Sequence, residues 1–169
     1  MNVIAPIKTD LMGKARRDTT YYPYHFASIF GRGMALNLAT SSPGCTADIA
    51  ENLPHLDVSG VHNAEAGVLA YFALNRRPER SAEMAISPQG FAGAAQVIDN
   101  HLMTHADVDV VTTSANPMAV VPQKGSGASM GGHTLNAKLL PLSCQMLYVK
   151  LSQSRKRPPA RRSLSLNLI

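Results

Sequence analysis

The sequence predicts a mixed α/β (α+β) fold, organised as one small domain with a disordered N-terminal segment and a basic C-terminal tail. Ser87 and Pro88 form a helix start, because serine caps helix N-termini and proline suits the first helical position. Apolar residues then recur every three or four positions to about residue 104, and a valine-rich strand pattern follows over 107–113. A helix that leads directly into such a strand is half of an α/β layer.

The 169 residues divide into three expected parts. Residues 1–33 form a loosely ordered basic and aromatic segment, residues 34–151 form the small α/β domain, and residues 152–169 form a disordered basic tail. The chain has no Trp, five Tyr and four Phe, so the core must consist mainly of aliphatic side chains. We expect a marginal core, because such side chains each bury little area at about 25 cal/mol per Å².

Basic residues precede a cluster of rings in the N-terminal segment. Lys14, Arg16 and Arg17 come just before residues 21–26, which contain three Tyr and one Phe. Such a segment could grip a nucleic acid through phosphate contacts and base stacking. The alternative is a short strand or turn cluster that packs its rings onto a core. We favour this alternative because no known nucleic-acid-binding motif frames the rings.

Short helices are expected before the Ser87 helix start. Residues 41–44 read as a turn, and residues 47–53 as one or two helical turns that end at Pro54. Residues 64–75 read as a longer helix with Asn63 as its N-cap, since apolar residues recur along one face.

Short strands and a glycine-rich loop are expected in the last third. Residues 118–121 and 145–150 read as strands, and residues 124–133 as a flexible loop or linker. A phosphate-binding loop is disfavoured, because Lys124 precedes the glycines and Met130 stands where a GxGxxG motif needs its last glycine.

Two histidines raise the question of a metal site. His101 and His105 share one face of the predicted helix, and Asp107 or Asp109 could add a carboxylate. A zinc-protease motif would need Glu at position 102, where the chain has Leu102. The simpler explanation is that His105 interacts with the dipole at the helix C-terminus. We therefore expect no metal and no cofactor.

No arrangement of residues indicates catalysis. The chain lacks a Gly-x-Ser-x-Gly motif, no carboxylate pair stands out, and Cys45 and Cys144 have no motif around them. A disulfide between them is possible. With no visible export signal and no apolar run long enough for a membrane span, we expect a non-enzyme in the reducing cytoplasm.

Charge is unevenly distributed along the chain. All eleven acidic residues lie at or before Asp109, whereas eight of the sixteen basic residues lie after it. A basic tail of this kind binds phosphates without sequence preference and is sensitive to salt. It could also serve only solubility, or not be a selected sequence at all. The nucleic-acid-binding residues that it predicts are Arg155, Lys156, Arg157, Arg161 and Arg162.

Two short segments resemble phage proteins. Residues 69–83 (LAYFALNRRPERSAE) resemble an opening segment of small phage Icd-like proteins, which are associated with inhibition of host cell division. Residues 90–95 (GFAGAA) resemble the small-residue run of the phage Ash family, found in satellite phages and prophages. The resemblance implies a prophage accessory or regulatory protein that binds a host or helper-phage protein. The alternatives are a nucleic-acid-binding protein that uses the tail and, third, a metal- or phosphate-dependent enzyme.

Overall fold

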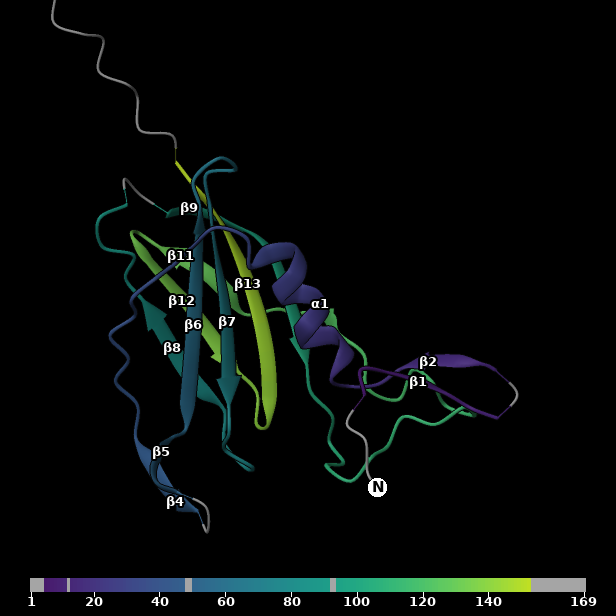
Figure 1. The fold of residues 1–169 in the computed structure, drawn as a ribbon. Coiled ribbons are helices and arrows are strands. Elements are labelled where there is room, and N and C mark those ends of the chain that lie inside the picture. Colours follow the sequence, from purple (N-terminus) through teal and green to yellow (C-terminus); the bar gives the residue numbers. More distant parts are fainter. Residues whose placement is uncertain (1–4, 12, 48–49, 92–93, 153–169) are drawn as a thin grey trace, which may run out of the picture.

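The chain folds into two antiparallel β-sheets packed face to face (Figure 1). A computed structural model describes residues 5–11, 13–47, 50–91 and 94–152. The larger sheet has the strand order β10-β9-β13-β7-β6-β3, and the smaller has the order β11-β12-β8. The larger sheet comprises β3 (Met34–Ala35), β6 (Leu56–Asn63), β7 (Val68–Asn75), β9 (Ala94–Met103), β10 (Gln123–Lys124) and β13 (Ser143–Leu151). The smaller comprises β8 (Ala82–Ile86), β11 (Ala128–Gly131) and β12 (Thr134–Leu139).

Two hairpins and one helix lie beside the two sheets. The hairpins are β1 (Ile7–Thr9) with β2 (Ala15–Arg17), and β4 (Gly44–Ala47) with β5 (Ala50–Pro54). The helix α1 (Tyr21–Phe30) is the only helix in the part of the chain that the structure describes. The predicted mixed α/β fold is therefore wrong, and the protein is mainly β.

The predicted helix over 64–75 is the central strand β7 of the larger sheet. β7 pairs with β6 on one side and β13 on the other, and most of its side chains are buried. A strand buried on both faces reads as a continuous apolar run, which periodicity cannot distinguish from a buried helix. Asn63 caps a turn instead of a helix, because its Oδ1 accepts a hydrogen bond from the Ala66 N–H at 3.0 Å.

The predicted helix over 88–104 is also wrong. Residues from Ala94 to Met103 form β9, which pairs with β13 over most of its length and with β10 near its end. Gly90 adopts a φ of +84°, which a helix does not allow, so the chain turns after Ser87 instead of entering a helix there. Pairing with distant strands outweighs the local helix signal.

Four further predictions concern shorter elements. The helical turns over 47–53 are wrong, since residues there contribute to the β4–β5 hairpin. The strands over 107–113 and 118–121 are wrong, because residues 104–122 form turns and irregular backbone. Asp107 Oδ1 accepts a hydrogen bond from the Asp109 N–H at 3.0 Å, which favours a turn at the start of this segment. The strand over 145–150 is confirmed by β13.

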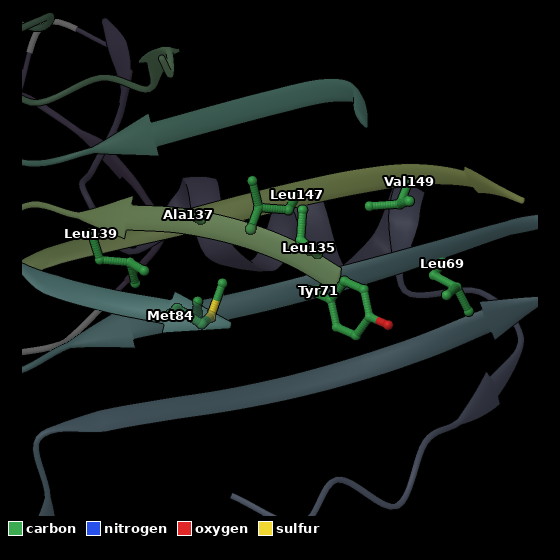
Figure 2. Packing of buried hydrophobic residues seen from close by; sticks show 9 residues of the cluster. Leu69, Tyr71, Met84, Leu135, Ala137, Leu139, Leu147 and Val149 are labelled. Atoms are coloured by element: carbon green, nitrogen blue, oxygen red, sulfur yellow. The ribbon is translucent and has the colours of Figure 1, made fainter. Parts of the chain in front are cut away.

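The hydrophobic core lies between the two sheets. Nine buried side chains from β7, β8, β12 and β13 meet there, and Figure 2 shows them projecting into the space between the strands. All are aliphatic except one tyrosine and one methionine. They are Leu69, Tyr71, Ala73, Met84, Leu135, Ala137, Leu139, Leu147 and Val149.

The helix α1 covers part of the outer face of the larger sheet (Figure 1). The ring centroids of Phe30 and of Tyr148 on β13 lie 5.0 Å apart, and those of Phe26 and of His101 on β9 lie 4.9 Å apart. Tyr22 is buried. The N-terminal rings therefore pack onto the body of the protein, as the favoured alternative expected, but a helix carries them instead of a strand or turn.

Candidate binding site

A hollow that we call the edge cavity lies at the open edge between the two sheets. It has a volume of about 580 Å³. The extended segment 36–41 that follows β3 forms one wall, and β8 with the turn after it forms another. Side chains of β6 and β7 form the floor. β8 is an edge strand that pairs only with β12, so one side of its backbone is free.

Tyr71 places a hydroxyl group at the edge cavity. The side chain is 1% exposed, yet it lines the cavity, and its hydroxyl has no hydrogen-bond partner among the described residues. Gly60 lies opposite Tyr71 in the strand register, and a Cβ there would lie 3.1 Å from Tyr71 Cδ1. Glycine thus leaves room for the ring to lie across β6. Burial raises the pKa of Tyr71 to about 12, so the hydroxyl stays neutral at physiological pH.

The other polar groups of the edge cavity are mostly uncharged. Hydroxyl and amide side chains line it at Asn37, Thr40, Ser41, Ser87 and Gln89. Among the described residues Glu83 is the only carboxylate in the lining, and no Lys, Arg or His side chain contributes to it. An anion such as a phosphate would therefore meet no positive partner, whereas a neutral polar molecule would meet donors and acceptors.

A second hollow, the helix-side cavity, lies between the start of α1 and the outer face of the larger sheet. Its volume is about 540 Å³, and its lining is mostly apolar, with Phe72, Leu74 and Met103 among the contributors. Burial raises the pKa of the Cys144 thiol in its wall, so that thiol is not an activated nucleophile. Cys144 and Cys45 are both free thiols, and the possible disulfide is absent.

Two carboxylates form ion pairs with a Lys or Arg side chain. Lys8 Nζ lies 2.5 Å from Asp18 Oδ2, and Arg76 Nη2 lies 2.8 Å from Asp57 Oδ2. Asp57 is the only carboxylate that lines the helix-side cavity. Each of these two cavities therefore has one carboxylate among the described residues of its lining.

The metal-site alternative receives no support from the geometry. His101 lies on β9, where its Nε2 lies 2.9 Å from Asp99 Oδ2, whereas His105 lies in the following loop with its ring at the Asp107 backbone. The helix face that would have joined the two rings does not exist. Within the described ranges no three His, Cys, Asp or Glu side chains are close enough to hold a metal ion.

The N-terminal basic residues make contacts within the chain. The Arg17 guanidinium lies 5.0 Å from the centre of the Tyr21 ring, and Arg16 Nη1 donates to Ser114 Oγ at 3.2 Å. The predicted nucleic-acid-binding residues of the tail lie outside the described residues. They are Arg155, Lys156, Arg157, Arg161 and Arg162.

The predicted flexible loop over 124–133 contains strand structure instead. It includes the end of β10 and all of β11, and the Gly125 N–H donates to the Asn100 carbonyl at 2.9 Å.

Tyr71 and Gly60, which shape the edge cavity, were not predicted from the sequence. A tyrosine in an apolar run and a glycine in a strand are common, so neither residue indicates a site before the strand register is known.

No helix of the described residues is both long and apolar enough to cross a bilayer.

Comparison with known proteins identifies related chains over most of the length. Residues 1–143 match the family described as the alpha-L-arabinofuranosidase C-terminal domain. The intracellular exo-alpha-(1->5)-L-arabinofuranosidase 1 of Bacillus subtilis is 34% identical over 150 residues, which are 89% of this chain and 29% of that protein. The intracellular exo-alpha-(1->5)-L-arabinofuranosidase of Streptomyces lividans is 35% identical over 145 residues, which are 85% of this chain and 21% of that protein. The chain thus spans less than a third of either relative.

Solved structures agree with this match. AbfB, a family 51 alpha-L-arabinofuranosidase from Bifidobacterium longum, superposes with a TM-score of 0.79 at 29% identity, over 88% of this chain and 29% of that one. The GH51 arabinofuranosidase of Xanthomonas axonopodis pv. citri superposes with a TM-score of 0.76 at 24% identity, over 86% of this chain and 29% of that one, and this likeness concerns the fold.

These comparisons overturn the functional predictions. The resemblance to Ash and Icd-like phage proteins is wrong, and so are the regulatory function, the host or phage protein partner and the nucleic-acid alternative. The expectation of a non-enzyme is also wrong, because the relatives are named as arabinofuranosidases. Short apolar segments such as 69–83, which contains the central strand, recur in unrelated proteins. The predicted cytoplasmic location is confirmed by relatives that are named intracellular.

Proposed function

Because the chain belongs to the family of alpha-L-arabinofuranosidase C-terminal domains, we propose that it serves as the C-terminal part of an enzyme that releases terminal α-L-arabinofuranosyl groups. The match of residues 1–143 to that family carries the proposal. Relatives named exo-alpha-(1->5)-L-arabinofuranosidases from Bacillus and Streptomyces support a substrate with α-1,5 linkages.

In this proposal the rest of the enzyme supplies the catalytic carboxylates. Hydrolysis of a glycosidic bond generally uses two carboxyl groups, about 5 to 9.5 Å apart, on either side of the scissile bond. Glu83 is the single carboxylate of the edge cavity and Asp57 that of the helix-side cavity. Asp57 Oδ2 lies 2.8 Å from Arg76 Nη2, so this carboxylate already has a partner within the chain.

The proposal assigns the N-terminal part of the chain to contacts with the rest of the enzyme. The described part of residues 1–33 exposes large apolar side chains on α1 and on the β1–β2 hairpin. Tyr24 on α1 is 70% exposed, and Ile7 in the hairpin is 55% exposed. Val111 and Met118 are exposed in the loop beside that hairpin (Figure 1), which Arg16 joins to the hairpin through Ser114. Large apolar side chains gathered on one side of a protein mark interaction surfaces.

A chimeric enzyme tests the proposal. The 150 matched residues of the Bacillus subtilis relative are replaced by this chain, and hydrolysis of an α-1,5-linked arabino-oligosaccharide is measured. We expect the chimera to retain activity, the relative without its matched part to lose it, and this chain alone to have none. Hydrolysis by this chain alone would refute the placement of the carboxylates, and a well-folded but inactive chimera would refute the assigned role.

A pair of variants tests the proposed contact surface within the same chimera. Tyr24→Ser replaces an exposed ring on α1, and Leu140→Ser replaces a side chain that is 38% exposed in the loop between β12 and β13. We expect the first to lower the thermal stability and activity of the chimera and the second to leave both unchanged. Equal effects of the two substitutions would argue against α1 as the contact surface.

A further inference from the structure

The edge cavity has features of a binding site that are separate from catalysis. It lies between the free edge of β8 and the extended segment 36–41, where no backbone hydrogen bond joins the two walls in the described residues. Its volume of about 580 Å³ falls within the range of roughly 300 to 1,000 Å³ that small-molecule sites occupy. The cavity therefore offers space, and backbone groups without strand partners, to a small ligand.

The Tyr71 hydroxyl is the strongest polar feature of this space. Tyr71 lines the cavity, and its hydroxyl makes no hydrogen bond within the described residues. The hydroxyl oxygen is not among the fully buried atoms that lack a partner, so it is open to water or to a ligand in the cavity. Gly60 lets the ring cross β6 toward Leu36, whose Cδ1 would lie 3.2 Å from a Cβ at Gly60. The hydroxyl is thus held at the cavity by the strand register.

The chemistry of the walls selects the class of ligand. The polar groups are neutral hydroxyls and amides apart from Glu83, so anions are disfavoured. Apolar surface from Val58 and Phe91 lies between these groups, and the Phe91 ring is held edge-on against His62 with centroids 4.8 Å apart. Apolar surface beside hydroxyl and amide groups matches a molecule whose faces carry C–H groups and whose rim carries hydroxyls.

We propose that the edge cavity binds a neutral sugar of one or two rings, with the Tyr71 hydroxyl and the Gln89 amide as hydrogen-bond partners and Phe91 against an apolar sugar face. The site binds and does not cleave the sugar, because it holds a single carboxylate. The existence of the site does not depend on the proposed function. The choice of L-arabinose as first probe does rest on it.

A titration of the full 169-residue chain tests the proposal. L-Arabinose is added while two-dimensional amide NMR spectra are recorded, and inorganic phosphate is titrated in parallel as an anionic control. We expect saturable shifts at residues 36–41 and 83–91 with L-arabinose and none with phosphate. The titration extends to about 50 mM sugar, a concentration that would detect even weak binding of a small ligand. Either the absence of saturable shifts over this range or a response to phosphate alone would overturn the proposal.

Two matched variants locate the hydrogen bond. Tyr71→Phe removes only the hydroxyl at the cavity, whereas Tyr148→Phe makes the same change beside Phe30 on the opposite face of the larger sheet. We expect about a tenfold or greater loss of affinity in Tyr71→Phe, since a sugar hydroxyl would lose its partner, and no change in Tyr148→Phe. Unchanged affinity in Tyr71→Phe would refute the assignment. If that variant does not fold, Gln89→Ala, at an exposed position of the rim, must lower the affinity instead.

This test and the chimera test can fail separately. Sugar binding is measured on this chain alone, and hydrolysis is measured on the chimera. An active chimera with no sugar binding would refute only the cavity proposal. Sugar binding by a chain whose chimera is inactive would refute only the proposed enzymatic role.

Discussion

Asn75 Nδ2 donates a hydrogen bond to the carbonyl oxygen of Leu140, 65 positions later in the chain, at a distance of 2.8 Å. The same amide also donates to the Arg80 carbonyl at 3.0 Å and accepts from the Arg77 N–H at 3.1 Å. Asn75 is fully buried. One side chain thus joins the loop after β7 to the loop between β12 and β13, and so connects the two sheets at one end.

Replacement of Asn75 by leucine should destabilise the protein strongly. Leucine has a similar volume but leaves the Leu140 carbonyl and the Arg77 N–H without this partner, so we expect a loss of about 2–4 kcal/mol in the free energy of unfolding. Urea denaturation measures it. Asn136→Ala is the control, because Asn136 is exposed and makes only a 3.4 Å contact with the Thr134 carbonyl. A loss no larger than that of the control would contradict the joining role.

Replacement of Gly125 by alanine should disturb a buried amide pair. A Cβ at Gly125 would lie 2.4 Å from Asn100 Oδ1, which accepts a hydrogen bond from Gln145 Nε2 at 2.8 Å. We expect a loss of about 1–3 kcal/mol, typical of overpacking. The neighbouring exposed residue gives the control variant Ser126→Ala, which should change the urea midpoint little. Equal midpoints for both variants would show that Asn100 can move away without cost.

The stabilisation by the pair of Asp18 and Lys8 should be lost in acid. The hydrogen bond from Lys8 holds the pKa of the Asp18 carboxyl below its usual value. Because the folded-state pKa is lowered, this contribution is complete above the unfolded-state value of about 3.9 and disappears as pH falls through the folded-state pKa. Urea midpoints of the wild type and Asp18→Asn should therefore differ at about pH 6 and approach each other as the pH falls below about 3.9.

The effect of this pair should be small, and a control is needed. Both side chains are partly exposed, which limits a surface pair to roughly 0–1 kcal/mol. Glu65→Gln changes an exposed carboxyl in the turn between β6 and β7. A difference between wild type and Asp18→Asn that stays constant from about pH 6 to pH 3, or that Glu65→Gln reproduces, would contradict the assignment.

Tyr71 should ionise at a higher pH than an ordinary tyrosine. Burial raises its pKa to about 12. Ultraviolet absorbance of tyrosinate during an alkaline titration should contain a late component that is missing in Tyr71→Phe and retained in Tyr148→Phe. Since the folded-state pKa is raised, neutral Tyr71 contributes stability below about pH 10, and this is lost as the pH rises toward 12. A late component that persists in Tyr71→Phe would show that another tyrosine is responsible.

One of the strands expected from the local sequence is present. A strand was expected over 145–150, and β13, which is mostly buried, is the strand observed there. The rings of residues 21–26 were expected to pack onto a core. Tyr22 is buried and Phe26 packs against His101, whereas Tyr24 is 70% exposed. Both predictions rest on side-chain properties that do not depend on which strands are neighbours.

The same patterns failed for β7 and β9, which are the strands on either side of β13. β7 is buried on both faces, and its apolar run from Val68 to Asn75 fits a helix equally well. The spacing along β9 also mimics a helix, although its hydrogen bonds go to β13, more than 40 positions later in the chain. Hydrogen bonds between distant strands leave no local trace in the sequence, so the mixed α/β prediction was wrong.

The sequence by itself determined the composition of this protein. The core is dominated by aliphatic side chains, no pair of carboxylates stands out, and the charged residues after Asp109 are all Lys or Arg. The tertiary structure alone decided that Gly60 faces Tyr71 and that a hydroxyl reaches the edge cavity. The physical reason is that composition and short-range spacing limit which side chains can be buried, whereas the register between strands sets which of them meet. That register depends on non-local hydrogen bonds and on the burial of both sheet faces at once.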